Sequence, residues 1–556
     1  MSWTTRPSTL LVVTALSTLA ACGDDTEATS SGAGGAGGAS PTAIAFAPLG
    51  SIVGESGKGS FRFGAASAAT QIENANPRTD WWTWTAPEDQ GGLDRGKGFV
   101  GDASNGYDLA LSDVALLTES HLDAYRFSIE WSRIEPERDV IDEEAIAHYG
   151  ALLDALIAAG IRPMVTVHHF SNPIWVADPR DPDCLNGPTD DNLCGFGSEG
   201  SPAILEEISE HAALLAERFG DRVDEWATVN EPVNYLIAGY GIGQFPPGKQ
   251  SILSESSLLG ELIPVVRDYL RFHAAIYDAL KASDTIDADG DGSPADVGFT
   301  LSVASWAPTQ NNAASEAQQD VDAAARVEYV YHHLFVDALR QGRFDSDLDG
   351  TMDEDLPEVA GTVDWLGVQY YFRAGVTGTG ADGSPGGVLP VLNVTPCFPP
   401  FDFGACLPIA DPTKCIPAMR YEYWEPGLYE VLRDFSQRWP DLPLVVTESG
   451  IATEVGQRRA EHVVRSLEQI ARAQDDGADV RGYYHWSLFD NFEWAEGFEP
   501  RFGLYQVDYQ SYARTPTEGA TVLGEIALSR EISVARRKEL GGLGPMTPEG
   551  DGSACP

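Results

Sequence analysis

Short runs of apolar and β-branched residues alternate along this chain with longer segments whose apolar residues recur at helical spacing. Runs of the first kind predict buried strands, and segments of the second kind predict amphipathic helices. The helical segments 143–160, 203–220, 324–342 and 458–477 each stop at a glycine, which commonly follows the last turn of a helix. The predicted strands begin at Phe61, Ala124, Arg162, Glu225, Val297, Trp365, Pro443 and Gly482.

Eight strands that alternate with helices in one large domain are typical of a (β/α)8 TIM barrel, a fold of the α/β class. We therefore predict a single barrel over residues 59–535. An open, doubly wound parallel sheet is the alternative. The sequence shows no glycine-rich phosphate-binding loop at the start of a helix, and this makes the open sheet less favoured.

The first residues have the composition of a targeting signal. Arg6 precedes the apolar run TLLVVTALSTLA, which is too short to cross a membrane as a mature helix. The run leads into LAAC, which resembles a bacterial lipobox. Residues 1–21 are therefore predicted to be a lipoprotein signal peptide, with Cys22 as the lipid anchor. A plain signal peptide followed by a chance cysteine is the alternative.

A segment rich in Gly, Ala and Ser follows Cys22, so we predict a flexible tether over residues 22–58 and a C-terminal tail over 536–556. These features predict a protein that is exported and attached by lipid to the bacterial cell envelope. Gly23 rather than aspartate follows the cysteine, so nothing there suggests retention in the inner membrane. The outer membrane is expected, and the periplasmic or surface side stays open.

Six cysteines remain besides Cys22, and an even number in an exported chain indicates disulfide bonds. Cys184 and Cys194 would close a single loop and are the easiest pair to predict. The other pairings stay open, because six cysteines can combine in many ways. The spacings fit no zinc template. The six are Cys184, Cys194, Cys397, Cys406, Cys415 and Cys555.

Composition limits the partners of the protein. The 84 acidic residues outnumber the 36 basic ones, and the formal net charge is −48. Such a chain is a poor partner for nucleic acid or for an anionic membrane surface, so we expect membrane contact only through the lipid anchor. A solvated acidic surface is the simplest interpretation of this charge.

Polar residues stand where the predicted strands stop, and that end of a TIM barrel carries the active site. Asn230 and Glu231 end the fourth strand, and Glu448 ends the seventh. Two carboxyl groups at strand ends, with Trp and amide side chains around them, suit glycoside hydrolysis. Taken alone, each residue has a plainer interpretation: a Glu at a strand end is usually a surface residue, and His169 would be a buried structural histidine.

Together these motifs resemble glycoside hydrolase family 1, the β-glucosidase family, from Phe61 to Arg514. The segments FRFGAASAATQIE, YRFSIEWSRIEP, TVHHF, TVNEP, VQYY and TESG resemble the family's strand-end motifs, and WSLFDNFEWAEGFEPRFGLYQVDY is the most specific signal. The resemblance implies that Glu231 is the acid/base and Glu448 the nucleophile, with Arg126 beside the nucleophile and Tyr371 hydrogen-bonded to it. It also implies substrate-binding roles for Gln71, His169, Asn230, Tyr371, Trp486, Glu493, Trp494 and Phe502.

Three residues depart from the family pattern. Phe170 stands where Trp is usual, and Gln369 and Ser449 each stand where Asn is usual. None of these changes removes a proton-transfer or nucleophilic group. The departures therefore put the fine substrate preference and the rate in question, but not the type of chemistry.

The implied reaction is hydrolysis of terminal, non-reducing β-linked sugars with retention of anomeric configuration, and β-glucosides are the favoured substrates. Retention requires two carboxyl groups about 5–5.5 Å apart. Arg126 and Tyr371 should keep Glu448 ionised, and this negative charge should raise the pKa of Glu231 so that it can donate a proton. The expected chemistry requires no metal or organic cofactor.

Two other functions stay in view. One is a catalytically inactive, lipid-tethered sugar-binding protein, which the presence of both carboxylates disfavours. The other is a 6-phospho-β-glycosidase, whose relatives hold phosphate with a Ser and a Lys near the last strand. Here Glu493 occupies that region and the segment EPRFGLY contains no Lys, so an anionic Glu would repel phosphate.

Two acidic loops away from the predicted active site have the spacing of a calcium loop. DADGDG at 287–292 and DSDLDG at 345–350 each carry Asp at the first, third and fifth positions and Gly at the sixth. Gly298 and Leu356 stand where an EF-hand needs Glu, so a complete EF-hand is not expected. Both loops precede strands, on the stability face of the barrel. Structural Ca²⁺ is weighed evenly against two solvated loops, and its ligands would be Asp287, Asp289, Asp291, Asp345, Asp347, Asp349 and Asp353.

Lipid attachment at Cys22 gives the first testable prediction. The Cys22→Ser variant lacks the thiol that carries the lipid, so it should move from the membrane fraction to the soluble envelope fraction, as followed by immunoblotting of fractionated cells. Ser40→Ala, in the same predicted tether, is the matched control and should stay with the membranes. Complete recovery of Cys22→Ser in the membrane fraction would contradict the anchor.

Overall fold

The computed structural model describes residues 41–252, 254–378, 389, 391–397 and 403–550. Contacts divide the chain into two units, Met1–Pro41 and Thr42–Pro556, and the second contains the barrel. The predicted signal peptide, Cys22 and the first part of the predicted tether lie outside the described residues. Within the described ranges, no helix is both long enough and apolar enough to cross a membrane.

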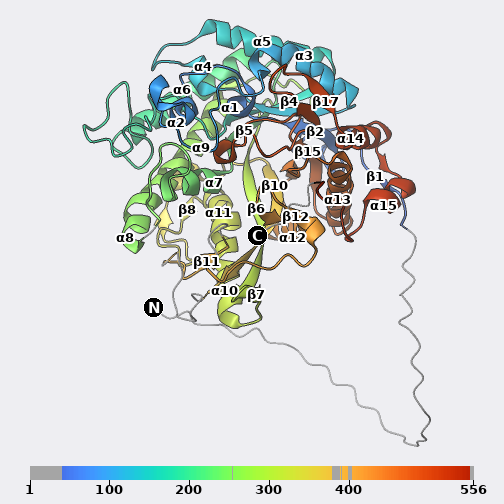
Figure 1. Cartoon of the computed structure of the whole chain (residues 1–556). Helices are drawn as coiled ribbons and strands as arrows, with labels where there is room; N and C mark the ends of the chain where they lie inside the picture. The colour runs from blue at the N-terminus through green and yellow to red at the C-terminus, as the bar shows by residue number, and fades with distance from the viewer. Residues whose placement is uncertain (1–40, 253, 379–388, 390, 398–402, 551–556) are drawn as a thin grey trace, which may run out of the picture. The chain divides into compact units, whose positions relative to one another are not determined.

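Eight parallel strands close into a barrel in the second unit (Figure 1). Each strand pairs with the next one along the chain, and the last pairs with the first through Gly482 and Arg62. The predicted (β/α)8 barrel is therefore confirmed. Its strands are β2 (Arg62–Ala66), β3 (Ala124–Ser128), β4 (Arg162–His168), β5 (Glu225–Asn230), β6 (Asp296–Gln310), β10 (Leu366–Thr377), β14 (Leu444–Ser449) and β15 (Val480–Trp486).

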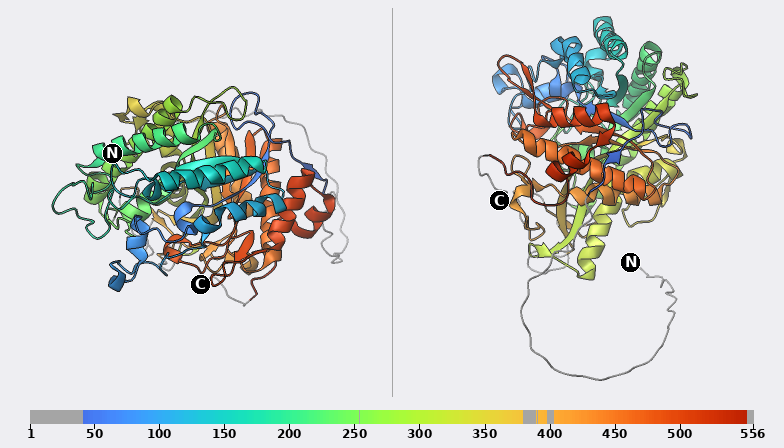
Figure 2. Two further views of the ribbon diagram at one scale, coloured as in Figure 1. Left: turned by 90° about the horizontal axis from the view of Figure 1, so that it is seen from above. Right: turned by 90° about the vertical axis from the view of Figure 1, so that its right-hand side faces the viewer.

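Helices connect each strand to the next and lie outside the strands (Figure 2). Every residue of β2, β3, β5, β14 and β15 is buried. Strands covered on both faces need apolar side chains in both directions, which explains why they stand out in the sequence as continuous apolar runs. The main helices are α3 (Gly106–Glu119), α5 (Glu143–Ala158), α6 (Ser201–Phe219), α9 (Ile263–Ser283), α10 (Gln318–Glu328), α11 (Leu334–Gln341), α12 (Glu425–Arg438), α13 (Gly456–Asp475) and α14 (Glu518–Ser529).

Helix boundaries follow local chemistry. The Asp142 side chain accepts hydrogen bonds from the first free backbone N–H groups of α5, and Gly160 just beyond the helix has a φ of +77°. The predicted helix 324–342 is not uniform, because a π-helical turn, η4 (Tyr329–His333), separates α10 from α11. Such turns often occur at functional sites, and η4 carries Tyr331, which contacts the active-site region described below.

Shorter elements fill the connections between the barrel strands and helices. The short helices are α1 (Ala69–Ile72), α2 (Asp80–Thr85), η1 (Glu88–Gln90), α4 (Trp131–Ile134), α7 (Pro232–Leu236), η2 (Ile237–Gly241), α8 (Glu255–Ser257), η3 (Leu258–Leu262), η5 (Pro357–Val359), η6 (Pro412–Lys414), η7 (Trp494–Glu496) and α15 (Val534–Leu540). The short strands are β1 (Ile44–Ala45), β7 (Ala313–Ala314), β8 (Arg343–Phe344), β9 (Glu354–Asp355), β11 (Thr395–Pro396), β12 (Cys415–Ile416), β13 (Tyr421–Glu422), β16 (Tyr505–Val507), β17 (Arg514–Pro516) and β18 (Glu531–Ile532).

Disulfide bonds close two loops of the described chain. The predicted Cys184–Cys194 pair is present, with Cα atoms 5.6 Å apart. Cys397 and Cys406 form a second bond, with Cα atoms 4.7 Å apart. Cys415 is also disulfide-bonded, and Cys555 lies outside the described residues.

The compact unit begins near Thr42 rather than at Gly59, the boundary predicted from the sequence. Strand β1 pairs antiparallel with β18, and Phe46 and Ile52 are buried in the core. The glycine-rich composition of this region masked these two anchoring residues. The described part of the predicted tail also contacts the barrel, since Glu549 accepts hydrogen bonds from the hydroxyl of Thr453.

Phe46 tests this boundary. Its ring lies 4.7 Å from that of Phe61 and 5.3 Å from that of Phe63, so Phe46→Ala should leave a cavity and lower the free energy of unfolding by about 3 kcal/mol. Leu49→Ala is the control, because Leu49 is 37% exposed and its loss should cost well under about 1 kcal/mol. Urea denaturation measures both. If both variants lose equally little free energy of unfolding, the tether extends to residue 58 as the sequence predicted.

Candidate active site

The carboxyl groups of Glu231 and Glu448 lie at the C-terminal ends of β5 and β14. Both residues are buried, with 7% and 4% of their surface exposed. Gln71, His169 and Trp486 also stand at or just beyond strand ends, on α1 after β2, after β4 and at the end of β15. The structure therefore brings the predicted residues to one rim of the barrel, where TIM barrels carry their active sites.

Two donors hold the carboxylate of Glu448. Arg126 Nη1 donates to Oε1 at 2.5 Å, and the hydroxyl of Tyr371 donates to Oε2 at 2.6 Å. Both partners were predicted from the sequence. A carboxylate fixed at each oxygen by a separate donor has a defined orientation, which an attacking group requires.

Arg126 links Glu448 to the neighbour of Glu231. Its Nη2 donates to Asn230 Oδ1 at 2.8 Å. The same oxygen accepts from Thr300 at 2.8 Å and from Gln369 at 2.9 Å. Gln369 is one of the departures from the family pattern, and its side-chain amide still donates a hydrogen bond to Asn230. With Oδ1 occupied by three donors, the amide nitrogen of Asn230 is the group left for a bound molecule.

Glu231 has a distinctive backbone and one side-chain donor. Its φ of +40° lies in the left-handed region, and Pro232 follows directly as the first residue of α7. Asn234 Nδ2 donates to Glu231 Oε2 at 2.7 Å, and the hydroxyl of Tyr331 donates to the side-chain oxygen Oδ1 of Asn234. Neither Asn234 nor Tyr331 was predicted from the sequence. The three-residue spacing from Glu231 to Asn234 on a helix was a usable signal, whereas Tyr331 is distant in the sequence.

The two carboxyl groups differ in pKa because their surroundings differ. Burial, and then the nearby charge of Glu448, raise the pKa of Glu231 to about 8. Burial also raises the pKa of Glu448 above its ordinary value, and Arg126 and Tyr371 oppose this rise. The expectation that Glu448 is held ionised is thus met only in part. Glu231, which has no comparable cation contact, is the carboxyl group that holds a proton near neutral pH.

Polar atoms without partners point to the kind of molecule that this site accepts. Gln71 Oε1 and His169 Nδ1 are buried and have no hydrogen-bond partner among the described residues. Burial, and then the charge of Arg126, hold the pKa of His169 well below its usual value, so the ring is neutral. A ligand with several hydroxyl groups would satisfy both atoms, since a hydroxyl donates and accepts.

Aromatic rings and Glu493 complete the predicted set. The His169 ring lies nearly parallel to those of Trp486 and Trp494, with centroids 6.2 and 6.0 Å away. Gln71 Nε2 donates to Glu493 Oε2 at 3.3 Å, and burial followed by the charge of Glu448 raises the pKa of Glu493 to about 8. The rings of Phe502 and Tyr371 meet edge to face at 6.0 Å.

The other departures from the family pattern are accommodated by packing. Phe170 is buried against Trp494, with ring centroids 5.3 Å apart. Ser449 is buried, and its hydroxyl lies 3.5 Å from His462 Nε2. Neither residue contacts the carboxyl group of Glu231 or Glu448 through a hydrogen bond that the structure describes.

Clusters with metal-ligand spacing lie away from these carboxyl groups. Within the described residues, none of the groups that could hold an ion includes Glu231 or Glu448. One group joins Asp287, Asp289 and Asp291 to Asp224, which the sequence analysis did not single out. Another contains Asp345, Asp347 and Asp349. Asp353 does not belong to it, and accepts hydrogen bonds from Ser346 instead.

Comparison with known proteins gives a consistent result. The family model for glycosyl hydrolase family 1 matches residues 55–532. The chain is 28% identical to a β-galactosidase of Pyrococcus woesei over 86% of its own length and 98% of that protein. It is 29% identical to a bifunctional β-D-glucosidase/β-D-fucosidase of Bifidobacterium breve, over 82% and 94% of the two chains. The solved β-glycosidase of Pyrococcus horikoshii is 30% identical, with a TM-score of 0.69 over 88% of this chain and 98% of that one.

The charge of Glu448 should control the pKa of Glu231. Glu448→Gln removes that charge, so the pKa of Glu231 should fall from about 8 towards its ordinary value. ¹³C NMR of protein labelled at the glutamate carboxyl, with Glu231→Gln to assign the signal, measures the change. Glu493→Gln is the matched control and should shift this pKa less, because the charge of Glu493 affects Glu231 less than that of Glu448 does. An unchanged pKa in Glu448→Gln would contradict the coupling.

Proposed function

The chain belongs to glycosyl hydrolase family 1, and on that premise we propose that it is a retaining β-glycosidase that prefers β-glucosides. The observation that supports this most is the pair of buried carboxyl groups, one held by Arg126 and Tyr371 and the other carrying a raised pKa. Retaining glycoside hydrolysis uses two such groups, one as nucleophile and one as proton donor.

In the first step, ionised Glu448 attacks the anomeric carbon of the bound sugar. The bond to the leaving oxygen breaks, and protonated Glu231 gives its proton to that oxygen. The products are a glycosyl ester on Glu448 and the free aglycone. Arg126 and Tyr371 orient the attacking carboxylate, because each holds one of its oxygens.

In the second step, water replaces the aglycone. The Glu448 charge that raised the pKa of Glu231 is lost when the ester forms, so Glu231 is now ionised and accepts a proton from the attacking water. The ester bond breaks and Glu448 regains its charge. Two displacements at the same carbon return the original anomeric configuration.

Recognition of the sugar is assigned to the atoms that lack partners. Gln71 Oε1 would accept a hydrogen bond from a sugar hydroxyl, and His169 Nδ1 would form one with a second hydroxyl. The amide nitrogen of Asn230 would donate a hydrogen bond to a further hydroxyl. The rings of Trp486 and Trp494 would cover the apolar face of the sugar. The preference for glucose rests on the resemblance to the β-glucosidase family alone, since the relatives named above include a β-galactosidase and a bifunctional β-D-glucosidase/β-D-fucosidase.

A 6-phosphorylated sugar is a weaker candidate for the substrate, although the structure changes the argument from charge repulsion by Glu493. Because the pKa of Glu493 is about 8, this side chain is protonated near neutral pH in the free site, so charge repulsion alone does not reject phosphate. The segment 499–505 still lacks Lys. Its one cation, Arg501, faces Asp490 and stacks on Tyr509, 4.6 Å from the ring centroid.

We also propose that the enzyme is exported and anchored through Cys22. Support comes from the lipobox-like LAAC sequence and from the disulfide bonds, which are typical of oxidising compartments. An anchored glycosidase would act on β-glycosides outside the cytoplasm.

Aryl and alkyl β-glycosides test the function and the two roles together. The β-glucoside should give the highest kcat/KM, ahead of the galactoside, the fucoside and the 6-phosphoglucoside, and NMR should show the β-anomer as the first product. Glu448→Gln should lose about 10³-fold or more in kcat/KM. Glu231→Gln should lose little with a dinitrophenyl leaving group and much more with an alkyl one, since only the latter needs protonation.

Glu499→Gln is the matched control. Glu499 is an exposed acid in the segment that also contains Glu493 and Trp494, and its substitution should leave all rates unchanged. Binding of glucosides without turnover would support an inactive sugar-binding protein instead. Equal losses of Glu231→Gln with both leaving groups would remove the acid assignment, and first release of the α-anomer would remove retention.

A further inference from the structure

The loop between α9 and β6 gathers four carboxyl groups at the end of the barrel opposite to Glu231. Asp287, Asp289 and Asp291 come from the loop, and Asp224 is the residue just before β5. One ligand oxygen from each of the four lies within 4.8 Å of the others. Asp224 was not part of the sequence motif, so the fold has added a fourth carboxylate to the three in the loop.

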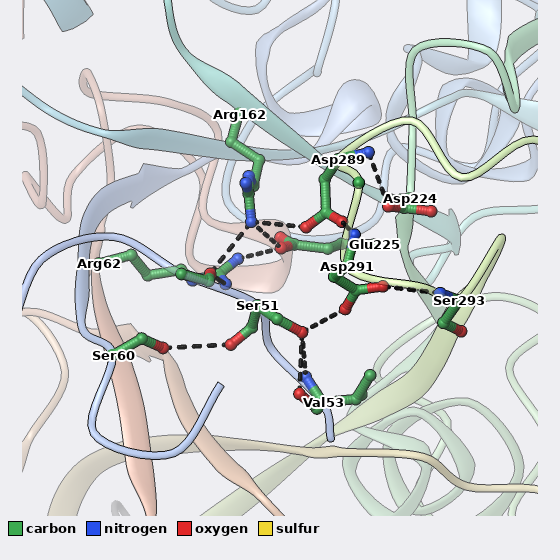
Figure 3. A network of polar contacts seen from close by, with 12 residues as sticks. Ser51, Val53, Ser60, Arg62, Arg162, Asp224, Glu225, Asp289, Asp291 and Ser293 are labelled. Carbon is green, nitrogen blue, oxygen red and sulfur yellow. Dashed lines mark hydrogen bonds and ion pairs between the residues drawn. The ribbon is translucent and has the colours of Figure 1, made fainter. Parts of the chain in front are cut away.

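Asp224 has a buried oxygen without a partner. The residue is only 4% exposed, and its Oδ2 accepts a hydrogen bond from the backbone of Asp289 at 3.0 Å. Its Oδ1 is buried and has no hydrogen-bond partner among the described residues. A buried carboxylate oxygen without a donor is unfavourable unless a cation or a proton reaches it. Figure 3 shows Asp224 beside Asp289 and Asp291, and one ligand oxygen of Asp224 lies within 4.8 Å of those of the three loop aspartates.

Nearby arginines do not balance the charge of this cluster. Arg162 pairs with Asp289 at 2.8 Å and with Glu225 at 3.4 Å, and Arg62 also pairs with Glu225 (Figure 3). Among the described ion pairs, Asp224, Asp287 and Asp291 have no basic partner. Asp291 accepts hydrogen bonds from Ser51 and Ser293, which are neutral donors. Within the described part of the chain, the four carboxyl groups therefore have only the Arg162 guanidinium as a basic partner, and Arg162 also pairs with Glu225.

We propose that Asp224, Asp287, Asp289 and Asp291 bind a structural Ca²⁺ ion. An all-oxygen carboxylate set is what this hard cation prefers. Calcium–oxygen bonds are about 2.4 Å long, so ligands on opposite sides of the ion lie about 5 Å apart, and ligand oxygens that all lie within 4.8 Å of one another can surround one such ion. Magnesium is usually held by one or two carboxylates and keeps several water ligands, so a set of four carboxyl groups favours calcium.

The second acidic loop lacks the feature that carries this proposal. Asp345 is also buried, but both of its oxygens have donors: Asp349 N reaches Oδ1 at 3.1 Å, and Tyr329 and Gly350 N reach Oδ2 at 2.9 and 2.7 Å. Asp347 and Asp349 are exposed. This loop is an acidic cluster only, and it supplies a matched control.

Calcium at this site would stabilise the barrel without entering the reaction. It would join the start of β5 to the loop that leads into β6, next to Ser51 of the N-terminal segment and Arg162 of β4. Glu231 follows the other end of β5, about 20 Å away along the strand at the usual rise per residue. Binding to the native state alone raises the melting temperature and leaves catalysis unchanged.

Metal analysis and calorimetry on the full chain test this proposal. After chelation and dialysis, addition of Ca²⁺ should raise the melting temperature by several degrees in a saturable manner, Mg²⁺ should do so less, and one Ca²⁺ per chain should remain bound. Turnover measured well below the melting temperature should not change. Absence of bound Ca²⁺ together with an unchanged melting temperature would overturn the site.

Variants separate this site from its control. Asp224→Asn should melt at the same or a higher temperature than wild type without Ca²⁺, because a buried charge is removed, yet its Ca²⁺ affinity should fall about tenfold or more. Asp287→Asn with Asp291→Asn should abolish the response. Asp345→Asn with Asp347→Asn should keep the full response. Loss of the response in this last variant, with retention in the other two, would place the ion elsewhere and overturn the proposal.

Discussion

The buried guanidinium of Arg126 is the interaction on which the site depends. It is fully enclosed, and from β3 it reaches Glu448 on β14, Asn230 on β5 and Thr300 on β6. A buried charge without partners is very costly, so each contact fixes both the cation and the strand end that supplies the partner. The position of the Glu448 carboxylate and the orientation of the Asn230 amide therefore follow from one side chain.

One cation facing several acids explains how the carboxyl groups divide their roles. Glu231, Glu448 and Glu493 are all buried enough for their pKa values to rise, but only Glu448 contacts Arg126 directly. The negative charge therefore concentrates on Glu448, and protons remain on the other two. In the proposed mechanism, the acid and the nucleophile are thus distinguished by geometry around a shared cation rather than by residue type.

Much of the fold and of the site was predictable from the sequence, and the same physical reasons explain which parts were not. Strands buried on both faces leave apolar runs, and polar residues such as Glu231 interrupt these runs where the barrel rim begins. Asn234 was missed although its three-residue spacing from Glu231 was a usable signal, whereas Asp224 could not be found because its contact with Asp289 arises only on folding. The start of the compact unit was misplaced because two buried side chains, Phe46 and Ile52, outweigh the flexible composition around them.

The left-handed backbone of Glu231 sets stability against function at this position. Residues with a Cβ lose about 1 kcal/mol or more in that conformation, whereas Gly adopts it freely and Asn tolerates it. Burial of the Glu231 carboxyl group is a second cost to stability at this position. A directed-evolution campaign that selects only for heat resistance would therefore tend to enrich Gly or Asn at residue 231, which would give stable barrels that lack the proposed acid/base. Libraries of this protein need an activity screen alongside any thermal selection.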